Sequence, residues 1–99
     1  MKYQAVFDGI TIHRNSDHIY THAWRVTCGS RERTGFAKSI DAAVRAVKSA
    51  QNGITGRSNL NSRNPWCQAN YQNQEYRTSV QLLEAQTTVE VVTVEQQIK

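Results

Sequence analysis

The sequence predicts an α+β domain in which an antiparallel sheet carries one helix on one of its faces. Two short alternating runs surround Asp8-Gly9, a longer alternating run ends at Cys28, and an amphipathic segment covers about 40–51. The 99 residues suffice for a single domain, 1–99, with a modest core. We therefore expect one sheet, built from an N-terminal meander and a C-terminal hairpin, with the helix packed against it.

The first two strands are predicted at residues 3–7 and 10–13. Asp8-Gly9 separates them, and this dipeptide tolerates the positive φ angles of a two-residue hairpin turn. We therefore expect a β-hairpin at the N-terminus.

A longer strand follows at 19–28 and completes the predicted meander. Every second residue is bulky or apolar over most of its length, which places four side chains on one face: Tyr20, Trp24, Val26 and Cys28. The favoured interpretation makes Trp24 a core residue beneath the helix. Arg25 and Thr27 then point the opposite way, and we expect that second face to be exposed and free to bind.

A short strand at 33–37, with Phe36 as its inward residue, leads into the predicted helix at 40–51. Ser39 is the expected N-cap, Asp41 suits the helix dipole, and Asn52-Gly53 is the expected left-handed exit. Apolar residues recur at spacings of three, four and seven, which predicts one buried stripe: Ile40, Ala43, Val44, Val47 and Ala50.

The second half of the chain begins with a polar segment at 55–74, rich in Asn, Gln, Ser and Gly, which predicts a long loop. Valine and threonine dominate the rest, so strands at 76–82 and 88–94 are favoured, with a helix over 79–85 as the alternative. Residues 88–94 also form a candidate edge strand able to pair with a second copy, so a homodimer is one expectation.

Charge is distributed unevenly along the chain. The net charge is +4, with a balance of +6 over residues 1–63 and −2 over residues 64–99. This asymmetry predicts a basic surface that attracts a polyanion or an acidic protein patch, and ordinary solubilising charge is the alternative. The candidate partner-binding or nucleic-acid-binding residues are Arg25, Arg31, Arg33, Lys38, Arg45, Lys48, Arg57, Arg63, Trp66 and Tyr71.

Composition argues against membrane and secreted classes. The longest apolar runs are far shorter than the roughly 18 residues of a bilayer-spanning helix, and the N-terminus lacks the apolar stretch of a signal peptide. We therefore expect a cytoplasmic protein. Cys28 and Cys67 are expected to be free thiols, with a bridge between them as the alternative.

Catalytic and cofactor motifs are not recognisable in the sequence. The histidines cluster in one region, neither cysteine has a nucleophile's setting, and no glycine-rich phosphate loop is present. His18 and His22 would lie about 13 Å apart along a strand, which is too far for one ion. We therefore expect no metal site, no cofactor and no enzymatic activity.

One stretch resembles a known family. Its matching elements are Trp24-Arg25-Val26, Gly35-Phe36, and Ser39 to Ala43 followed by Ala46 and Ala50. Together these are similar to the three-strand-plus-helix DNA-binding domain of the ethylene-response-factor and integrase-arm type, whose sheet enters the major groove. The resemblance covers residues 24–53. It implies that Arg25, Arg31 and Arg33 contact DNA, and that Trp24 contacts a sugar or belongs to the core.

Two function classes remain. The favoured one is a small inhibitor or adaptor that phages or mobile elements direct against a host defence or regulatory complex, in the manner of anti-CRISPR or anti-restriction proteins. The alternative is a protein that binds DNA, RNA or a nucleoprotein through the basic residues from Arg25 to Lys38. A charge of +4 is modest for a dedicated DNA-binding protein, and no groove-reading helix is apparent, which favours the first class.

Overall fold

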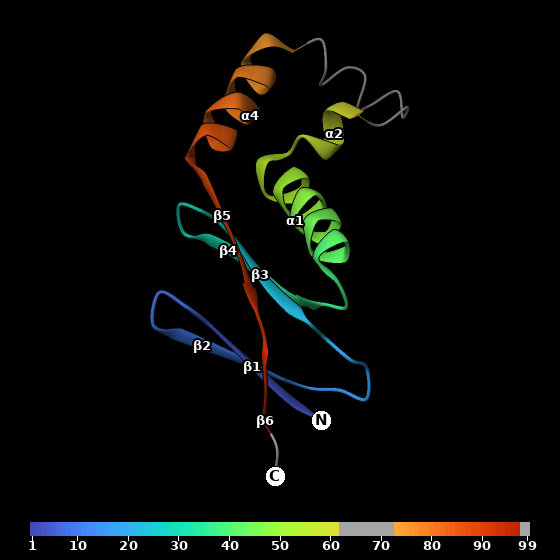
Figure 1. Cartoon of the computed structure of the whole chain (residues 1–99). Coiled ribbons are helices and arrows are strands. Elements are labelled where there is room, and N and C mark those ends of the chain that lie inside the picture. Colours follow the sequence, from blue (N-terminus) through green and yellow to red (C-terminus); the bar gives the residue numbers. More distant parts are fainter. Residues whose placement is uncertain (62–72, 98–99) are drawn as a thin grey trace.

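The computed structural model describes residues 1–61 and 73–97 and confirms an α+β fold with antiparallel sheets (Figure 1). The molecule is elongated, with principal extents of 54 × 27 × 18 Å. Its elements, in chain order, are β1 (Lys2–Phe7), β2 (Ile10–Asn15), β3 (His22–Cys28), β4 (Arg31–Ala37), α1 (Ile40–Thr55), α2 (Ser58–Asn61), α4 (Gln74–Gln86), β5 (Thr87–Thr93) and β6 (Glu95–Gln97).

The predicted N-terminal hairpin is confirmed. β1 and β2 pair antiparallel, with Phe7 opposite Ile10 across the turn. Asp8 and Gly9 have φ angles of 49° and 79°, as a type I′ turn requires. Alternate residues of β1 are buried, namely Tyr3, Ala5 and Phe7.

The prediction that β3 extends this hairpin into a meander is wrong. The strands form two separate sheets, ordered β2-β1-β6 and β4-β3-β5. The chain after β2 crosses the end of β1 instead of turning back beside β2. The Ser16 amide donates to the Met1 carbonyl at 3.0 Å, and the Tyr3 hydroxyl donates to the His18 carbonyl at 2.9 Å. β3 therefore starts a second sheet.

Helix α1 is confirmed, with the Ser39 hydroxyl accepting from the Ala42 amide at 3.1 Å. The predicted exit at Asn52-Gly53 is wrong, because the helix continues to Thr55 and ends at Gly56, whose φ is 86°. Burial of Ile54 and Thr55 supplies the packing that extends it.

The buried stripe of α1 contains fewer residues in the first turns of the helix than predicted. It consists of Ala43, Val47, Ala50 and Ile54. Ile40 and Val44 are 49% and 42% exposed, so their predicted burial is wrong. Both residues lie on the flank of the stripe, where no described element covers them fully.

The predicted strand at 76–82 is wrong, and the helical alternative is correct. α4 covers Gln74–Gln86, and the Asn73 side chain caps it by accepting from the amides of Glu75 and Tyr76 at 3.0 and 3.2 Å. The C-terminal hairpin is therefore replaced by a helix that leads into β5. Of the predicted loop at 55–74, its first residue belongs to α1, 58–61 form α2, and 62–72 lie outside the described residues.

The final strand connects the two sheets. β5 pairs antiparallel with β3 from Thr87 to Thr93, and β6 pairs with β1 from Glu95 onward. Between them, the Val94 amide donates to the Thr21 carbonyl at 3.1 Å. In Figure 1 this segment runs from α4 past β3 and β1 toward the C-terminus as one nearly continuous strand.

Apolar clusters cover both faces of β3. On one face, Val26 and Cys28 pack with Val47, Ala50 and Ile54 of α1. On the other, Ala23 packs with Ala5 and Phe7 of the first sheet, supported by several half-buried residues: Ile12, Phe36, Val92 and Val94. The expectation that this second face is exposed is therefore wrong, because the first sheet covers it.

Trp24 lies across Gly35 on the neighbouring strand. A Cβ atom at Gly35 would come within 2.6–2.8 Å of three indole ring atoms, well inside van der Waals contact. The ring is half-buried and packs against the cluster beneath α1, which agrees with Trp24 as a core residue. Glycine at this position is therefore what allows the indole to lie flat on the sheet.

We expect Gly35→Ala to destabilise the fold by about 1–3 kcal/mol, because the rigid indole must shift within a packed core. Urea unfolding followed by circular dichroism measures the change. Gly53→Ala is the matched control: its Cβ would meet only the mobile end of Arg33, at 3.2 Å. Higher helix propensity makes that variant neutral or more stable by up to about 1 kcal/mol. Equal stability of Gly35→Ala and the wild type would contradict the assigned packing.

Candidate functional site

Arg25 is the centre of an ion-pair cluster. Its guanidinium lies 3.1 Å from Glu32, 3.6 Å from Asp8 and 3.7 Å from Glu90, and its side chain is only 15% exposed. Two of its nitrogens, Nε and Nη2, donate to one Glu32 oxygen. The three carboxylates come from the β1–β2 turn, β4 and β5, so Arg25 links both sheets.

This setting makes Arg25 a structural residue. A guanidinium that already donates to its own carboxylates must break these contacts before it can bind a phosphate. The surrounding carboxylates would also repel a nucleic-acid backbone. A DNA-contacting role for Arg25 therefore stays a prediction of the family resemblance. The geometry around Arg25 favours a structural role instead.

Arg31 and Arg33 project from the opposite face of the same sheet. They pair with Cys28 and Val26, whose side chains face α1. Arg31 donates to the Ile54 carbonyl at 3.1 Å, at the negative end of the α1 dipole. The guanidinium of Arg33 lies over Gly53. The three predicted DNA-contacting arginines are therefore divided between two faces of the sheet.

Arg57 forms the second strong ion pair. Its Nε and Nη2 donate to the two Glu84 oxygens at 2.7 and 2.6 Å. The hydrogen bond from Arg57 lowers the pKa of Glu84, and the same bond raises the pKa of Arg57. This bidentate pair joins the end of α1 to α4.

Three of the predicted cations share a different setting. Lys38 precedes the N-cap of α1, and Arg45 and Lys48 lie on the helix, three residues apart and therefore on one side of it. All three are exposed, and no hydrogen bond or ion pair connects their side chains to any described residue. We call these residues the α1 cationic face. The predicted residues Arg63, Trp66 and Tyr71, like Cys67, lie outside the described residues.

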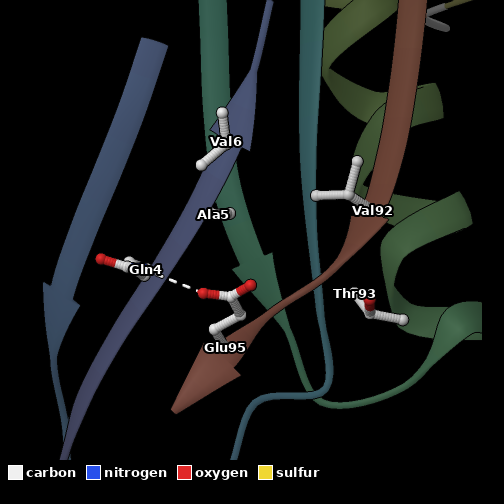
Figure 2. Close-up of a pocket in the computed structure, with 6 residues that line it drawn as sticks. All are labelled: Gln4, Ala5, Val6, Val92, Thr93 and Glu95. Carbon is white, nitrogen blue, oxygen red and sulfur yellow. Dashed lines mark hydrogen bonds between the residues drawn. The ribbon is translucent and has the colours of Figure 1, made fainter. Parts of the chain in front are cut away.

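A small cavity lies where the two sheets separate. It has a volume of about 160 Å³ and is lined by Gln4, Ala5, Val6, Val92, Thr93 and Glu95 (Figure 2). Glu95 is its only ionisable lining residue and accepts a hydrogen bond from the Gln4 amide nitrogen at 3.0 Å. Typical small-molecule pockets are about 300–1,000 Å³. This cavity is therefore small for a ligand pocket, and its lining residues include no recognisable nucleophile held by a base.

Other features that could carry a function are a thiol, a metal-binding cluster or a membrane-spanning helix. Cys28 is a buried free thiol that donates to the Leu83 carbonyl. Within residues 1–61 and 73–97, no three His, Cys, Asp or Glu side chains converge in a way that could hold a metal ion. In that same part of the chain, no helix has both the length and the apolar character for crossing a bilayer.

Comparisons with models of protein families, with curated proteins and with solved structures give no significant match.

Sequence reasoning missed the acidic partners of the cations. Glu32 on β4 and Glu90 on β5 lie seven and sixty-five residues after Arg25, and each reaches it from a strand beside β3. No local pattern can reveal the contact with Glu90. The Asn73 cap was visible, because Asn followed by an acidic residue in the first turn is a helix-start signal. That signal would have identified α4.

We expect Arg25→Ala to lower the free energy of unfolding by about 1–3 kcal/mol, because it leaves three neighbouring carboxylates without their cation. Arg45→Ala is the matched control and should stay within about 0.5 kcal/mol of the wild type, since its side chain has no described partner. Urea unfolding at pH 7 measures both. A neutral Arg25→Ala would contradict the structural role.

We expect Glu84→Gln to cost at most about 1 kcal/mol at pH 7, because both side chains of the pair are more than a third exposed and screened by solvent. The pKa of Glu84 is lowered in the folded state, so the pair stabilises the fold above pH 4.5, the ordinary value. That contribution is lost as the pH falls through the lowered pKa. The stabilities of variant and wild type should therefore converge on acidification, and a difference independent of pH would contradict the ion pair.

Proposed function

We propose that this chain is a non-enzymatic binding protein that engages an acidic patch on a protein partner through the α1 cationic face. The partner class we propose is a host defence or regulatory complex, with the chain acting as an inhibitor or adaptor of the kind that phages and mobile elements carry. The main support for this proposal is a contrast between two groups of cations. Lys38, Arg45 and Lys48 are exposed and have no partner among the described residues. Arg25 and Arg57, in contrast, form ion pairs within the protein.

The position of this face supports recognition of a partner. α1 is fixed on the second sheet by its buried stripe and at both ends, by the Ser39 cap and by the Arg31 contact with Ile54. Its outward cations are therefore presented from a rigid element. Complementary charge of this kind increases the rate of association and the selectivity for an acidic partner.

Direct nucleic-acid binding is the second candidate, because exposed cations also bind phosphates. Three cations that each neutralise one phosphate give a slope of only about −2.7 in log K against log salt. The exposed carboxylate of Asp41 also lies on the helix, four residues before Arg45. These features favour an acidic protein over a polyanion.

Charge reversal on α1 tests the proposal. We expect Arg45→Glu/Lys48→Glu to weaken capture of a partner complex from a host lysate at least tenfold, which is about 1.4 kcal/mol. The matched control, Lys2→Glu/Arg14→Glu, makes the same change of net charge on the first sheet and should retain the partner.

Two outcomes would overturn this proposal. Equal capture by both double variants would exclude the α1 cationic face as the binding surface. A mobility shift of duplex or single-stranded nucleic acid at low salt, abolished by Arg45→Glu/Lys48→Glu, would show that the surface serves nucleic acid instead.

A further inference from the structure

The second edge of β5 pairs with no strand that the structure describes. The sheet order β4-β3-β5 places β5 at the margin, and β1 joins the same final strand only at β6. Natural proteins protect long edges with proline, bulges, lysine or covering elements, because unpaired backbone groups recruit another strand. The sequence of β5, TTVEVVT, contains no proline or lysine, and its one charged residue, Glu90, lies opposite Arg25 and is paired with it.

The direction of the backbone groups follows from the register. Cys28 and Arg31 flank a two-residue turn, so the even-numbered residues of β3 bond to β4 and the odd-numbered ones to β5. The bond from the Val94 amide to the Thr21 carbonyl belongs to the same ladder. Even-numbered residues of β5 therefore bond to β3. Val89 and Val91 direct their amides and carbonyls to the open edge, as does the Thr87 carbonyl, while the Thr87 amide donates to the Glu84 carbonyl at the end of α4.

The accessible part of this edge is its first five residues. The cavity shared with β1 lies at Val92 and Thr93, and β1 crosses close to the strand there (Figure 2). Thr87 to Val91 lie beyond the cavity. A second strand added opposite Thr88–Val91 therefore would not meet the cavity.

An apolar strip accompanies the open edge. Val89 is 39% exposed and pairs with Val26, so its side chain is on the α1 side of the sheet. Val44 is nine residues before Gly53, which places it on the opposite flank of α1 from the one facing Arg33 and β4. Ile40 shares that flank. The exposed residues Ile40 and Val44 therefore project on the β5 side of the helix.

We propose that this edge is a self-association site, where β5 of a second copy pairs antiparallel around a two-fold axis at Val89. This register places Val89 opposite itself, Thr87 opposite Val91, and Thr88 opposite Glu90. It avoids two facing Glu90 carboxylates, which the register centred on Glu90 would create. Arg25 lies 3.7 Å from Glu90 and neutralises the only charge on the strand.

The two-fold arrangement explains the apolar strip as well. An axis perpendicular to the sheet keeps both α1 helices on the same side of a joined six-stranded sheet. Val89 of each copy then lies on the same side of the joined sheet as both α1 helices. The contact belongs with the smaller interfaces, below about 1,200 Å² in total, so we expect micromolar dissociation.

Sedimentation equilibrium of the full chain from about 5 to 500 μM tests the proposal. We expect the mass to rise from 11.2 kDa toward twice that value. Val89→Lys should remain monomeric, because an edge lysine blocks strand addition. The matched control is Val6→Lys, an exposed valine on the first sheet, which should dimerise like the wild type.

Symmetric cross-linking provides a second readout in a Cys67→Ser background. Oxidation should join Val89→Cys into a covalent dimer with a high yield, and Val6→Cys with none, because only residue 89 faces its own copy at the axis. A monomeric wild type at 500 μM, or a Val89→Lys variant that dimerises normally, would overturn the proposal. Loss of partner capture by Arg45→Glu/Lys48→Glu with the dimer intact separates this site from the α1 cationic face.

Discussion

The segment from β5 to β6 holds the architecture together, because β5 belongs to one sheet and β6 to the other. β5 completes the second sheet beside β3, and β6 covers the second edge of β1. The first sheet is thereby held against the face of β3 that carries Ala23 and Arg25. Burial of that face, the clustering of carboxylates around Arg25 and the open edge of β5 all follow from this one pairing arrangement.

The charge pattern shows why a basic sequence need not give one basic surface. Neighbouring residues of a strand point to opposite faces, so Arg25 and the Arg31–Arg33 pair are separated by the sheet itself. Arg25 and Arg57 are then neutralised by acids from distant segments. Among the described residues, the three cations of the α1 cationic face are exposed and take part in no such ion pair.

Local signals in the sequence predicted the elements whose determinants are local. Asp8-Gly9 forms its turn, Ser39 caps its helix, alternation identified β3, and the valine and threonine content identified β5. A helix over 79–85 was only the alternative prediction for the α4 segment, because only Val80 is buried along α4, which leaves almost no apolar periodicity to detect.

The arrangement of the sheets was beyond sequence reasoning for a different reason. Gln4 pairs with Glu95, and nothing near either residue specifies a partner so remote in the chain. The candidate site could not be predicted in full for the same reason. Its residues were identifiable as basic, but which of them are neutralised depends on long-range pairing. The edge strand was recognisable from its composition, because valine and threonine without proline or lysine are typical of a strand that can accept another.

Amide hydrogen exchange by NMR, residue by residue along β5, tests the central claim most directly. The account predicts slow exchange at Thr88, Glu90 and Val92 at every protein concentration, since these amides bond to β3. Val89 and Val91 should exchange rapidly in dilute solution and slow down as the concentration rises. Protection of Val89 and Val91 in dilute solution, or rapid exchange that no increase in concentration slows, would contradict an open edge that a second copy occupies.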